Sequence, residues 1–302
     1  MKATAFAPAS VGNVGPGFDV LGLAVDGIGD RITVELTDGE ARVAAVTGRD
    51  SKFVPLDSSR NVAAIAACAW LTSAGIDKRP VVTIDKGLAL AGGMGGSAAS
   101  SVGGAFAASL AARQTATPES IMAAALVGEA RVAGRHLDNI APCVLGGLAL
   151  VRSVDPIDVV AIAVPGNWSV ILLTPHVRIR TKEARAILPE KWDRASWVQQ
   201  MANTAALAHG FATGDAALVR RSLDDHFAEP VRAPLIPNFR EIKKAALDAG
   251  AIGCSISGSG PTIFAITTDR ANECASAMKA ALRDVASDIH IGSIARQGVR
   301  AV

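Results

Sequence analysis

The uncharged stretch from residue 87 to residue 112 constrains the fold more than any other feature of the sequence. It is long enough to cross a bilayer. However, it consists mostly of Gly, Ala and Ser, and the bulky apolar side chains that drive membrane insertion are sparse in it. We therefore predict a Gly-rich loop at residues 92–96, followed by a long buried helix that begins near Ser97.

Length and composition favour two packed domains and argue against binding of nucleic acid. The chain has 302 residues, of which 50% are hydrophobic. Its 30 Lys plus Arg nearly balance its 28 Asp plus Glu, so no strong field attracts a polyanion. Only 4% of residues are aromatic and none is Tyr, which leaves few surfaces on which bases can stack.

The cysteines and the N-terminus indicate a reduced, cytoplasmic setting. Cys68, Cys143, Cys254 and Cys274 are far apart, which suggests neither a zinc site nor a disulfide framework. The first residues, MKATAFAPAS, lack the apolar stretch of a secretory signal, so we expect the mature protein to begin here. We expect no membrane span.

The first half of the sequence has the pattern of short strands followed by small-residue helices. Residues 31–36 and 41–46 predict two strands joined as a hairpin around Thr37, Asp38 and Gly39. Residue 81 begins a further strand that ends at residue 85, and more strands are expected between residues 148 and 174. Helices are expected at residues 61–73 and 117–131, the second with Thr117 as N-cap and Pro118 in its first turn.

The second half of the sequence predicts a different pattern of helices and strands, also α+β. A boundary near Pro165-Gly166 separates the two halves. Helices are expected at residues 182–187, 195–211, 215–223, 239–249 and 271–284. Strands at residues 254–257 and 262–267 flank the turn Gly258-Ser259-Gly260-Pro261, and residues 289–295 form the last strand. This order predicts a split βαβ unit with its helices on one face of an antiparallel sheet.

The Gly-rich loop is suited to binding phosphate. Glycines let backbone N–H groups turn toward a ligand, and the following helix directs its positive dipole end to the same place. The Ser97 hydroxyl is then placed to bind a magnesium ion on that phosphate. Close packing of two helices is the alternative explanation of an isolated Gly-Ala-Ser run.

Two known nucleotide loops fit this segment less well. A Walker A loop is excluded because no Gly-Lys-Ser or Gly-Lys-Thr follows. Residues 93–98 do satisfy GxGxxA, the fingerprint of dinucleotide-binding enzymes such as dehydrogenases. That interpretation is weaker, because the preceding strand ends several residues too early and no acidic residue follows a second strand at the expected distance.

Two further segments are rich in turn-forming residues and carry polar side chains. Residues 8–19 hold Asn13 and Asp19, which can bind an amine or a hydroxyl, and also Phe18, which a plain surface turn does not explain. Residues 255–262 form a sharp turn that is either a simple hairpin or part of a ligand site.

Together the three segments resemble the GHMP superfamily of small-molecule kinases. That family has a P-x-S-x-N-L-G-P-G-F-D segment, a P-x-x-x-G-L-G-S-S-A-A phosphate loop and an S-G-x-G-P-T turn, in the order found here. The resemblance implies transfer of the γ-phosphate of ATP to a hydroxyl group with Mg²⁺. It also implies a two-domain α+β fold, with a ribosomal protein S5 domain 2-like nucleotide-binding domain at residues 1–165 and a ferredoxin-like split βαβ domain at residues 166–302.

Further segments resemble the branch of this superfamily that phosphorylates the amino acid L-homoserine in threonine biosynthesis. They are residues 136–142 (HLDNIAP) with Leu145-Gly146-Gly147, residues 181–189 (TKEARAILP) and residues 229–237 (EPVRAPLIP). The resemblance implies that two arginines hold the α-carboxylate, which suits a bidentate guanidinium, and that Asp19 holds the α-ammonium. The expected substrate-binding residues are Asn13, Asp19, His136, Asp138, Asn139, Arg185 and Arg232.

The same resemblance assigns the nucleotide, metal and catalytic residues. Asn61 is expected near adenine and Lys86 near phosphate, and the whole nucleotide set is Asn61, Lys86, Gly92, Gly93, Met94, Gly95, Gly96, Ser97, Ala98, Ala99 and Ser100. Ser97 and Glu129 are the expected Mg²⁺ ligands. The expected catalytic residues are Asn139, Ser97, Glu129 and Thr181.

Departures from the family pattern leave alternatives open. Asn139 stands where some members have an aspartate base, so we expect it to orient the hydroxyl while the proton leaves late, unless Asp138 takes it. Gly96 replaces a loop serine, Ala89 the leading proline and Met94 the usual leucine. A mevalonate-type acceptor and a non-catalytic nucleotide-binding relative are the alternatives, and we expect a homodimer.

Overall fold

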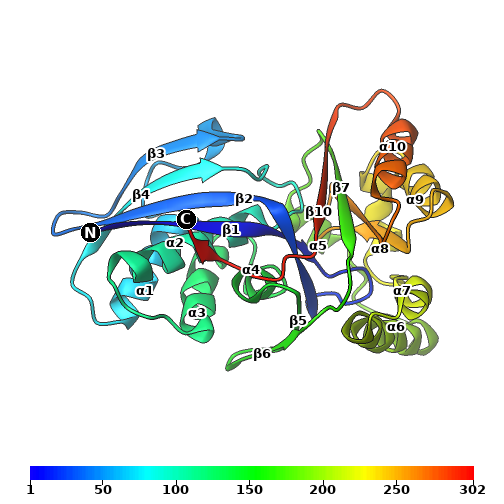
Figure 1. The fold of residues 1–302 in the computed structure, drawn as a ribbon, viewed down its shortest axis with the longest axis horizontal. Coiled ribbons are helices and arrows are strands. Elements are labelled where there is room, and N and C mark those ends of the chain that lie inside the picture. The colour runs from blue at the N-terminus through cyan, green and yellow to red at the C-terminus, as the bar shows by residue number, and fades with distance from the viewer.

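The computed structural model describes residues 1–302 as two domains that lie side by side along the long axis of the molecule (Figure 1). The N-terminal domain is a seven-stranded sheet with the order β11-β1-β2-β4-β3, and β5 and β6 extend it from β2. Its strands are β1 (Lys2–Gly12), β2 (Leu21–Thr37), β3 (Arg42–Gly48), β4 (Arg79–Lys86), β5 (Leu148–Val154), β6 (Ile157–Ile162) and β11 (Arg300–Ala301).

Four helices cover one face of this sheet (Figure 1). They are α1 (Val62–Ser73), α2 (Gly96–Ala111), α3 (Pro118–Glu129) and α4 (Ile140–Leu145), and a 3-10 turn η1 (Ser51–Phe53) follows β3. Asn61 and Thr117 accept hydrogen bonds from the first turns of α1 and α3, as N-caps do.

The C-terminal domain is an antiparallel four-stranded sheet of β7 (Ser169–Pro175), β8 (Gly253–Ile256), β9 (Ile263–Thr267) and β10 (Ser287–Ser293). Numbered within this domain, the strands lie in the order fourth, first, third, second, which is the ferredoxin-like arrangement predicted from the sequence. The helices α9 (Phe239–Asp248) and α10 (Ala271–Leu282) pack on it. Between β7 and α9 the chain inserts α5 (Thr181–Ala186), α6 (Arg194–Thr213), α7 (Ala216–Ser222), α8 (Glu229–Arg232) and η2 (Ala233–Leu235).

The predicted hairpin around Thr37, Asp38 and Gly39 is wrong. β2 and β3 are not partners, because β4 lies between them, antiparallel to β2 and parallel to β3. Helix α1 provides the crossover that brings β4 back in the direction of β3. The sheet is otherwise antiparallel, so the loop before α2 does not belong to the parallel βαβ unit that a dinucleotide fingerprint requires.

Two other boundaries differ from the sequence prediction. The segment that begins at Pro8 is still strand as far as Gly12, with a bulge between Pro8 and Ala9, and the turn begins only at Asn13. The end of the chain also leaves the C-terminal domain: Ala301 pairs with Ala5 in β1, and Ile294 bridges to Val25 in β2.

The uncharged stretch forms the predicted loop and buried helix. Small residues on α2 let it approach the sheet and α1, since a Cβ on Gly103 would lie 2.5 Å from Cγ1 of Ile32, and one on Gly104 would lie 2.3 Å from the Ala63 carbonyl oxygen. In this structure, no helix combines the length and the apolar character needed to span a membrane. Close packing of two helices is therefore also real, but for Gly104 against α1 rather than for the loop glycines, whereas Gly103 lets α2 approach the sheet.

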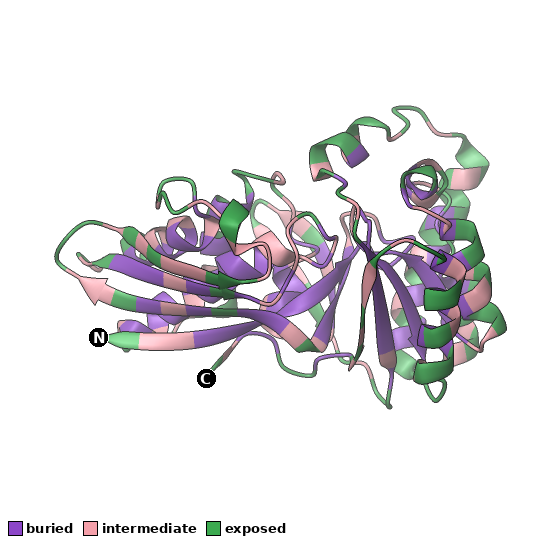
Figure 2. Ribbon diagram, turned by 90° about the horizontal axis from the view of Figure 1, so that it is seen from above, coloured by how far each residue is buried: buried purple, intermediate pink, exposed green.

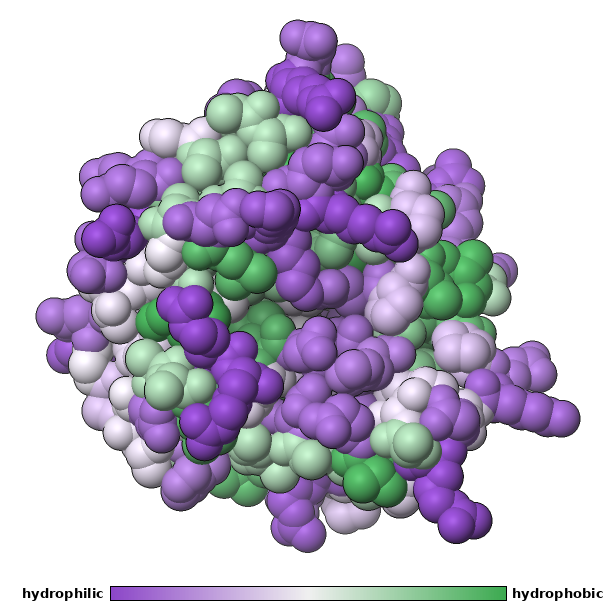
Figure 3. Space-filling view, turned by 90° about the vertical axis from the view of Figure 1, so that its right-hand side faces the viewer, coloured by the Kyte–Doolittle hydropathy of each residue, from purple (hydrophilic) through white to green (hydrophobic).

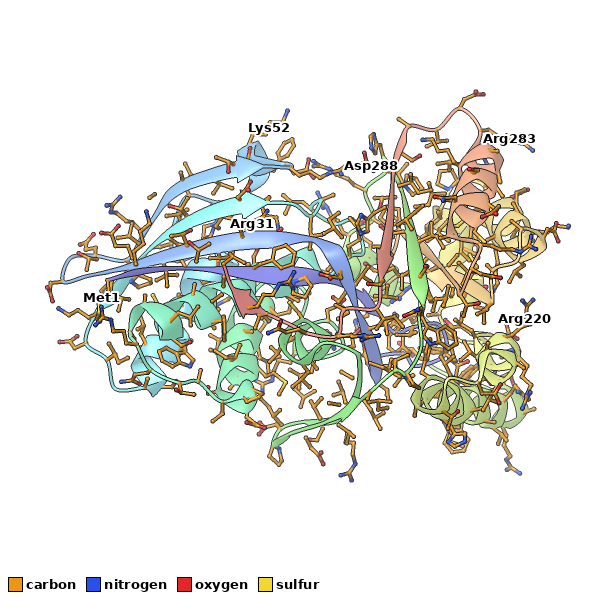
Figure 4. All side chains as sticks on the ribbon, in the orientation of Figure 1. Met1, Arg31, Lys52, Arg220, Arg283 and Asp288 are labelled. Atoms are coloured by element: carbon orange, nitrogen blue, oxygen red, sulfur yellow. The ribbon has the colours of Figure 1, made fainter.

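The two domains share packing. The larger hydrophobic cluster has 51 buried residues and includes Leu207 and Phe264 of the C-terminal domain, and buried residues follow the strands of both sheets (Figure 2). Arg49, after β3, also donates to Asp288 on β10, which lies on the side of β10 toward β3 and β4 (Figure 4). The second, wholly C-terminal cluster has 18 buried residues.

A buried ion pair lies beneath the start of α2. Lys86, the last residue of β4, donates to Asp30 on β2, and both side chains are almost fully buried. Lys86 also donates to the Gly96 carbonyl oxygen and to Ser100 Oγ, each over 3.0 Å. Asp30 accepts from the backbone N–H groups of Gly87 and Leu88 as well. The pair therefore fixes both ends of the loop to the sheet.

We expect the variant Lys86→Met to lose about 3 to 5 kcal/mol in the free energy of unfolding, because it leaves the Asp30 carboxylate buried without its counter-ion. The matched control is Lys78→Met, which breaks an exposed pair with Asp38 and should cost less than about 1 kcal/mol. Urea denaturation of the three proteins measures both values, and equal losses for the two variants would contradict the assignment.

Candidate active site

A cavity of about 450 Å³ opens between the two domains and gathers most of the residues predicted from the sequence. The predicted residues that line it are Asn13, Asp19, Asn61, Lys86, Gly92, Gly93, Gly95, Gly96, Ser97, Ser100, Glu129, His136, Asp138, Asn139, Thr181, Arg185 and Arg232. Met94, Ala98 and Ala99 do not line it, because their side chains are buried in the core below the loop. Any role of these three in binding is restricted to their backbone.

The Gly-rich loop turns its carbonyl groups away from the cavity. The Gly92 oxygen accepts from the backbone N–H and the hydroxyl of Thr262, the Gly93 oxygen accepts from Ser257 Oγ over 2.6 Å, and the Met94 oxygen accepts from the Ser10 N–H over 3.1 Å. No N–H group from Gly92 to Ala98 has an acceptor within the protein. These donors, at the N-terminus of the long helix α2, form a nest that is suited to an anion.

Two glycines of the loop are required by the geometry. Gly93 has φ +81°, and a Cβ there would lie 2.6 Å from the Ser257 carbonyl oxygen. Gly95, the N-cap of α2, has φ +66°, and a Cβ there would lie 2.1 Å from Ser10 Oγ. Side chains at either position would push the loop away from the turn or from β1.

Ser97 and Glu129 form the pair expected of a metal site. Ser97 Oγ donates to Oε1 of Glu129 over 2.9 Å, while Oε2 of Glu129 is buried and has no hydrogen-bond partner. Burial raises the pKa of Glu129 to about 7, and the nearby Asp138 adds to this against the Ser97 hydrogen bond. A hydroxyl and one unpartnered carboxylate oxygen suit Mg²⁺, which takes few protein ligands and completes its shell with phosphate and water. The residues present therefore fit the ion.

Lys86 and Asn61 lie at the cavity but are held by the protein itself. Lys86 faces Asp30 and the Gly96 carbonyl, so it shapes the phosphate loop rather than presenting a free charge. Asn61 accepts from the N–H groups of Ala63 and Ala64 and donates to the Pro55 carbonyl over 2.8 Å. Its side chain thus holds the segment that precedes α1 against the cavity.

The opposite end of the cavity carries a cluster of opposite charges. Arg185 donates from both terminal nitrogens to the two carboxylate oxygens of Asp19, over 2.9 and 3.0 Å, and its buried Nε has no partner. Nδ1 of His136 lies 3.7 Å from Asp19, and burial lowers the pKa of this imidazole. Buried Arg232 donates from Nε to the Ala184 carbonyl and from Nη1 to the Gly258 carbonyl.

Asn13 shapes this end of the site from within the turn. Its Oδ1 accepts from the Asp19 N–H over 3.1 Å, and its Nδ2 donates to the Gly258 carbonyl over 3.1 Å. Thr181, at the first turn of α5, lies with its hydroxyl 3.5 Å from Ser259 Oγ. The bond from Asn13 to Gly258 joins the N-terminal turn to the turn at residues 258–261, and the contact of Thr181 joins α5 to the same turn.

Asp138 and Asn139 lie between the two ends of the cavity. Asn139 accepts from Ser10 Oγ over 2.9 Å, which leaves its amide nitrogen as the group able to donate, and that nitrogen lies 3.4 Å from Asp138 Oδ2. Gly12 makes room for both, since a Cβ there would lie 2.6 Å from each side chain. Burial, and next the charge of Asp19, raise the pKa of Asp138 to about 7.

The sequence analysis missed the apolar wall near α1 and gave Phe18 no role. Phe53, Val54, Pro55, Val62 and Leu90 line the cavity on the side of the phosphate loop. The only signal for the first three is the short apolar run at residues 53–56, which ends a few residues before the α1 cap Asn61. Phe18 lines the other end, beside the two arginines.

The comparisons with known proteins fit this geometry. The family model of the GHMP kinase N-terminal domain matches residues 60–147, and that of the GHMP kinase C-terminal domain matches residues 206–284. The chain belongs to the GHMP kinases. It is thus an ATP-dependent kinase whose phosphate acceptor is a hydroxyl group.

Curated relatives of this GHMP kinase carry the name homoserine kinase. The protein from Chloroherpeton thalassium is 41% identical over 315 residues, covering 99% of both chains, and that from Arabidopsis thaliana is 40% identical over 269 residues, covering 86% of this chain and 72% of its own. The crystal structure of homoserine kinase from Cytophaga hutchinsonii superimposes with a TM-score of 0.95 at 40% identity, covering 100% of this chain and 97% of that one.

A more distant GHMP kinase shares the fold alone. Mevalonate kinase from L. major superimposes with a TM-score of 0.70 at 15% identity and covers 94% of each chain. The two-domain α+β fold predicted from the sequence is confirmed by these neighbours.

We expect Asp138→Asn to stabilise the ligand-free kinase at pH 8 but much less at pH 5. The folded state holds the Asp138 proton up to a pKa of about 7, above the ordinary value of 3.8, so stability from this group is complete below pH 4 and is lost as pH rises through 7. The amide removes this loss, which amounts to at most about 4 kcal/mol. Thermal melts of both proteins at the two pH values measure the difference, and an equal gain at both would contradict the raised pKa.

Proposed function

We propose that this kinase transfers the γ-phosphate of ATP to the side-chain hydroxyl of L-homoserine and forms O-phospho-L-homoserine for threonine biosynthesis. The observation that carries the proposal is the charge arrangement at the end of the cavity away from the Gly-rich loop, where Asp19, Arg185 and Arg232 meet. An α-amino acid presents the complementary ammonium and carboxylate there. Its hydroxyl then extends toward the loop. The names of the curated relatives support the same substrate.

The loop end of the cavity suits the nucleotide. The free N–H groups and the dipole of α2 favour the phosphates, and the wall at Phe53, Val54 and Pro55 is apolar enough to pack on adenine. Ser97 and Glu129 would hold Mg²⁺. When bound, this ion neutralises charge on the phosphates, which is the main demand of phosphoryl transfer together with in-line positioning.

The acceptor end changes partners when the amino acid binds. Without ligand, Asp19 and Arg185 neutralise each other through two parallel hydrogen bonds. The α-ammonium takes the place of the guanidinium on Asp19, and the guanidinium becomes free to bind the α-carboxylate together with Arg232. At the end of this exchange Asp19 again faces a cation and both guanidiniums share an anion, which favours a zwitterion over a simple acid.

Asn139 orients the acceptor hydroxyl in this proposal. Because its oxygen already accepts from Ser10, its amide nitrogen donates to the hydroxyl oxygen and leaves the other lone pair for attack. The proton leaves late, without a dedicated side-chain base. Asp138 is the alternative base, because its Oδ2 lies 3.4 Å from the Asn139 amide nitrogen. A loss of 100-fold or more in kcat for Asp138→Asn would assign it that role.

Two properties outside the site complete the proposal. We place the enzyme in the cytoplasm, which suits its four free cysteines. We also expect a homodimer. Exposed apolar side chains on α6, namely Trp197, Val198 and Met201, support a partner surface, and green patches interrupt the hydrophilic C-terminal face (Figure 3). Light scattering of the purified protein measures its mass in solution and so tests the homodimer.

The decisive experiment measures ADP release by the purified protein with Mg-ATP and L-homoserine, mevalonate, galactose or L-threonine. We expect selective turnover of L-homoserine, because it alone presents the ammonium, the carboxylate and a hydroxyl at the right reach. Turnover of mevalonate instead would assign the mevalonate-type alternative. ATP binding without turnover of any acceptor would assign a non-catalytic relative and point to Gly96.

We expect Glu129→Gln to lower kcat and to raise the Mg²⁺ concentration at half-maximal rate, each by about 10- to 100-fold, since a neutral amide replaces the buried carboxylate. Glu119→Gln is the matched control, because Glu119 is exposed in the first turn of the same helix. A Mg²⁺ titration of the rate checks both variants. An unchanged midpoint for Glu129→Gln would remove Glu129 from the metal site.

A further inference from the structure

We propose that Phe18 is a positioning residue whose ring holds the guanidinium groups of Arg185 and Arg232 in place for the carboxylate of the acceptor. The inference deepens the proposed function and rests on it. Phe18 lines the cavity, and its ring centroid lies 5.2 Å from Cζ of Arg185 and 5.3 Å from Cζ of Arg232. Both distances are within the range of cation–π attraction.

The ring is itself held firmly. Phe227 meets it edge to face at a centroid distance of 5.0 Å and an interplanar angle of 80°, and Trp192 packs on Phe227 at 5.0 Å. The turn behind it is also fixed, since the Pro16 carbonyl accepts from both Gln200 Nε2 and Thr204 Oγ1 over 2.8 Å. A ring packed in this way is able to set the position of two long side chains.

The charges explain why a ring is needed at this place. Arg185 and Arg232 repel each other, and burial followed by the charge of Arg185 lowers the pKa of Arg232. Of the two arginines, Asp19 binds only Arg185, and in the proposed exchange it leaves that guanidinium when the substrate ammonium arrives. The negative face of an aromatic ring attracts both cations without forming a salt bridge that the carboxylate would have to break. The guanidiniums therefore stay in place while their anionic partner changes.

A second ring in the protein provides a matched control. Phe6 on β1 also contacts two arginines, with Cζ of Arg300 at 4.5 Å and Cζ of Arg31 at 5.5 Å from its centroid. Phe6 does not line the cavity. Replacing it removes the same kind of interaction without touching the acceptor.

The test compares Phe18→Leu, Phe18→Tyr and Phe6→Leu by steady-state kinetics with L-homoserine. For Phe18→Leu we expect the KM for L-homoserine to rise on the order of 5- to 30-fold, with kcat within about twofold of the parent, since two cation–π contacts are lost. Phe18→Tyr keeps an aromatic face, so its KM for L-homoserine should stay near that of the parent. Phe6→Leu should leave it unchanged.

A second acceptor separates the role of the ring from simple packing. 3-Aminopropan-1-ol has the amine and the hydroxyl of homoserine but no carboxylate. We expect its kcat/KM to be equal in the parent and in Phe18→Leu. An equal loss with both acceptors, or an unchanged KM for L-homoserine, would overturn the inference.

Two further measurements keep the outcome decisive. If Phe18→Leu does not fold, pentafluorophenylalanine at position 18 keeps the shape of the ring but reverses its charge distribution, and it should raise the KM in the same way. An unchanged KM would overturn the inference. Failure of the parent protein to phosphorylate L-homoserine would overturn the proposed function instead, so the two failures are distinguishable.

Discussion

The hydrogen bonds between the Gly-rich loop and the turn of the C-terminal domain organise the whole molecule. Thr262 and Ser257 bind the carbonyl oxygens of Gly92 and Gly93, and with the carbonyl groups held there the N–H groups of the loop stay without acceptors in the protein. The same bonds join the two domains at the point where they share a ligand site. Each domain therefore contributes to the nest proposed for phosphate, one by providing its amides and the other by orienting them.

Local features of the sequence predicted most of the helices and strands, whereas they could not predict how strands far apart in the sequence pair. The caps of α1 and α3 were predictable because Asn61 and Thr117 bond within their own first turns. The split βαβ layout followed from the order of elements in the second half, and its strand order is the ferredoxin-like one that the family resemblance implied. The partner of β3 did not, because the alternation of side chains says which residues form a strand but not that β4 lies between β2 and β3.

The candidate site also has residues that the sequence predicted and others whose role depends on long-range packing. Charged side chains such as Asp19, Arg185 and Arg232 were predictable as a group because a resemblance to known motifs links segments far apart in the sequence. The role of Lys86 was not, since its partner Asp30 has no motif and is known only from the packing of β2 against β4. An uncharged residue among charged ones, such as Phe18, gains a meaning only when its neighbours are placed in space.

The return of the last strand to the first has a consequence for how the protein is made. β11 completes the sheet by pairing with β1, so the N-terminal domain lacks this edge strand until residues 300–301 have left the ribosome. During synthesis the exposed edge of β1 has no partner, and the domain that is translated first cannot be the first to be finished. A tag fused after Val302 would adjoin this N-terminal sheet, whereas one placed in a loop of the C-terminal domain would not.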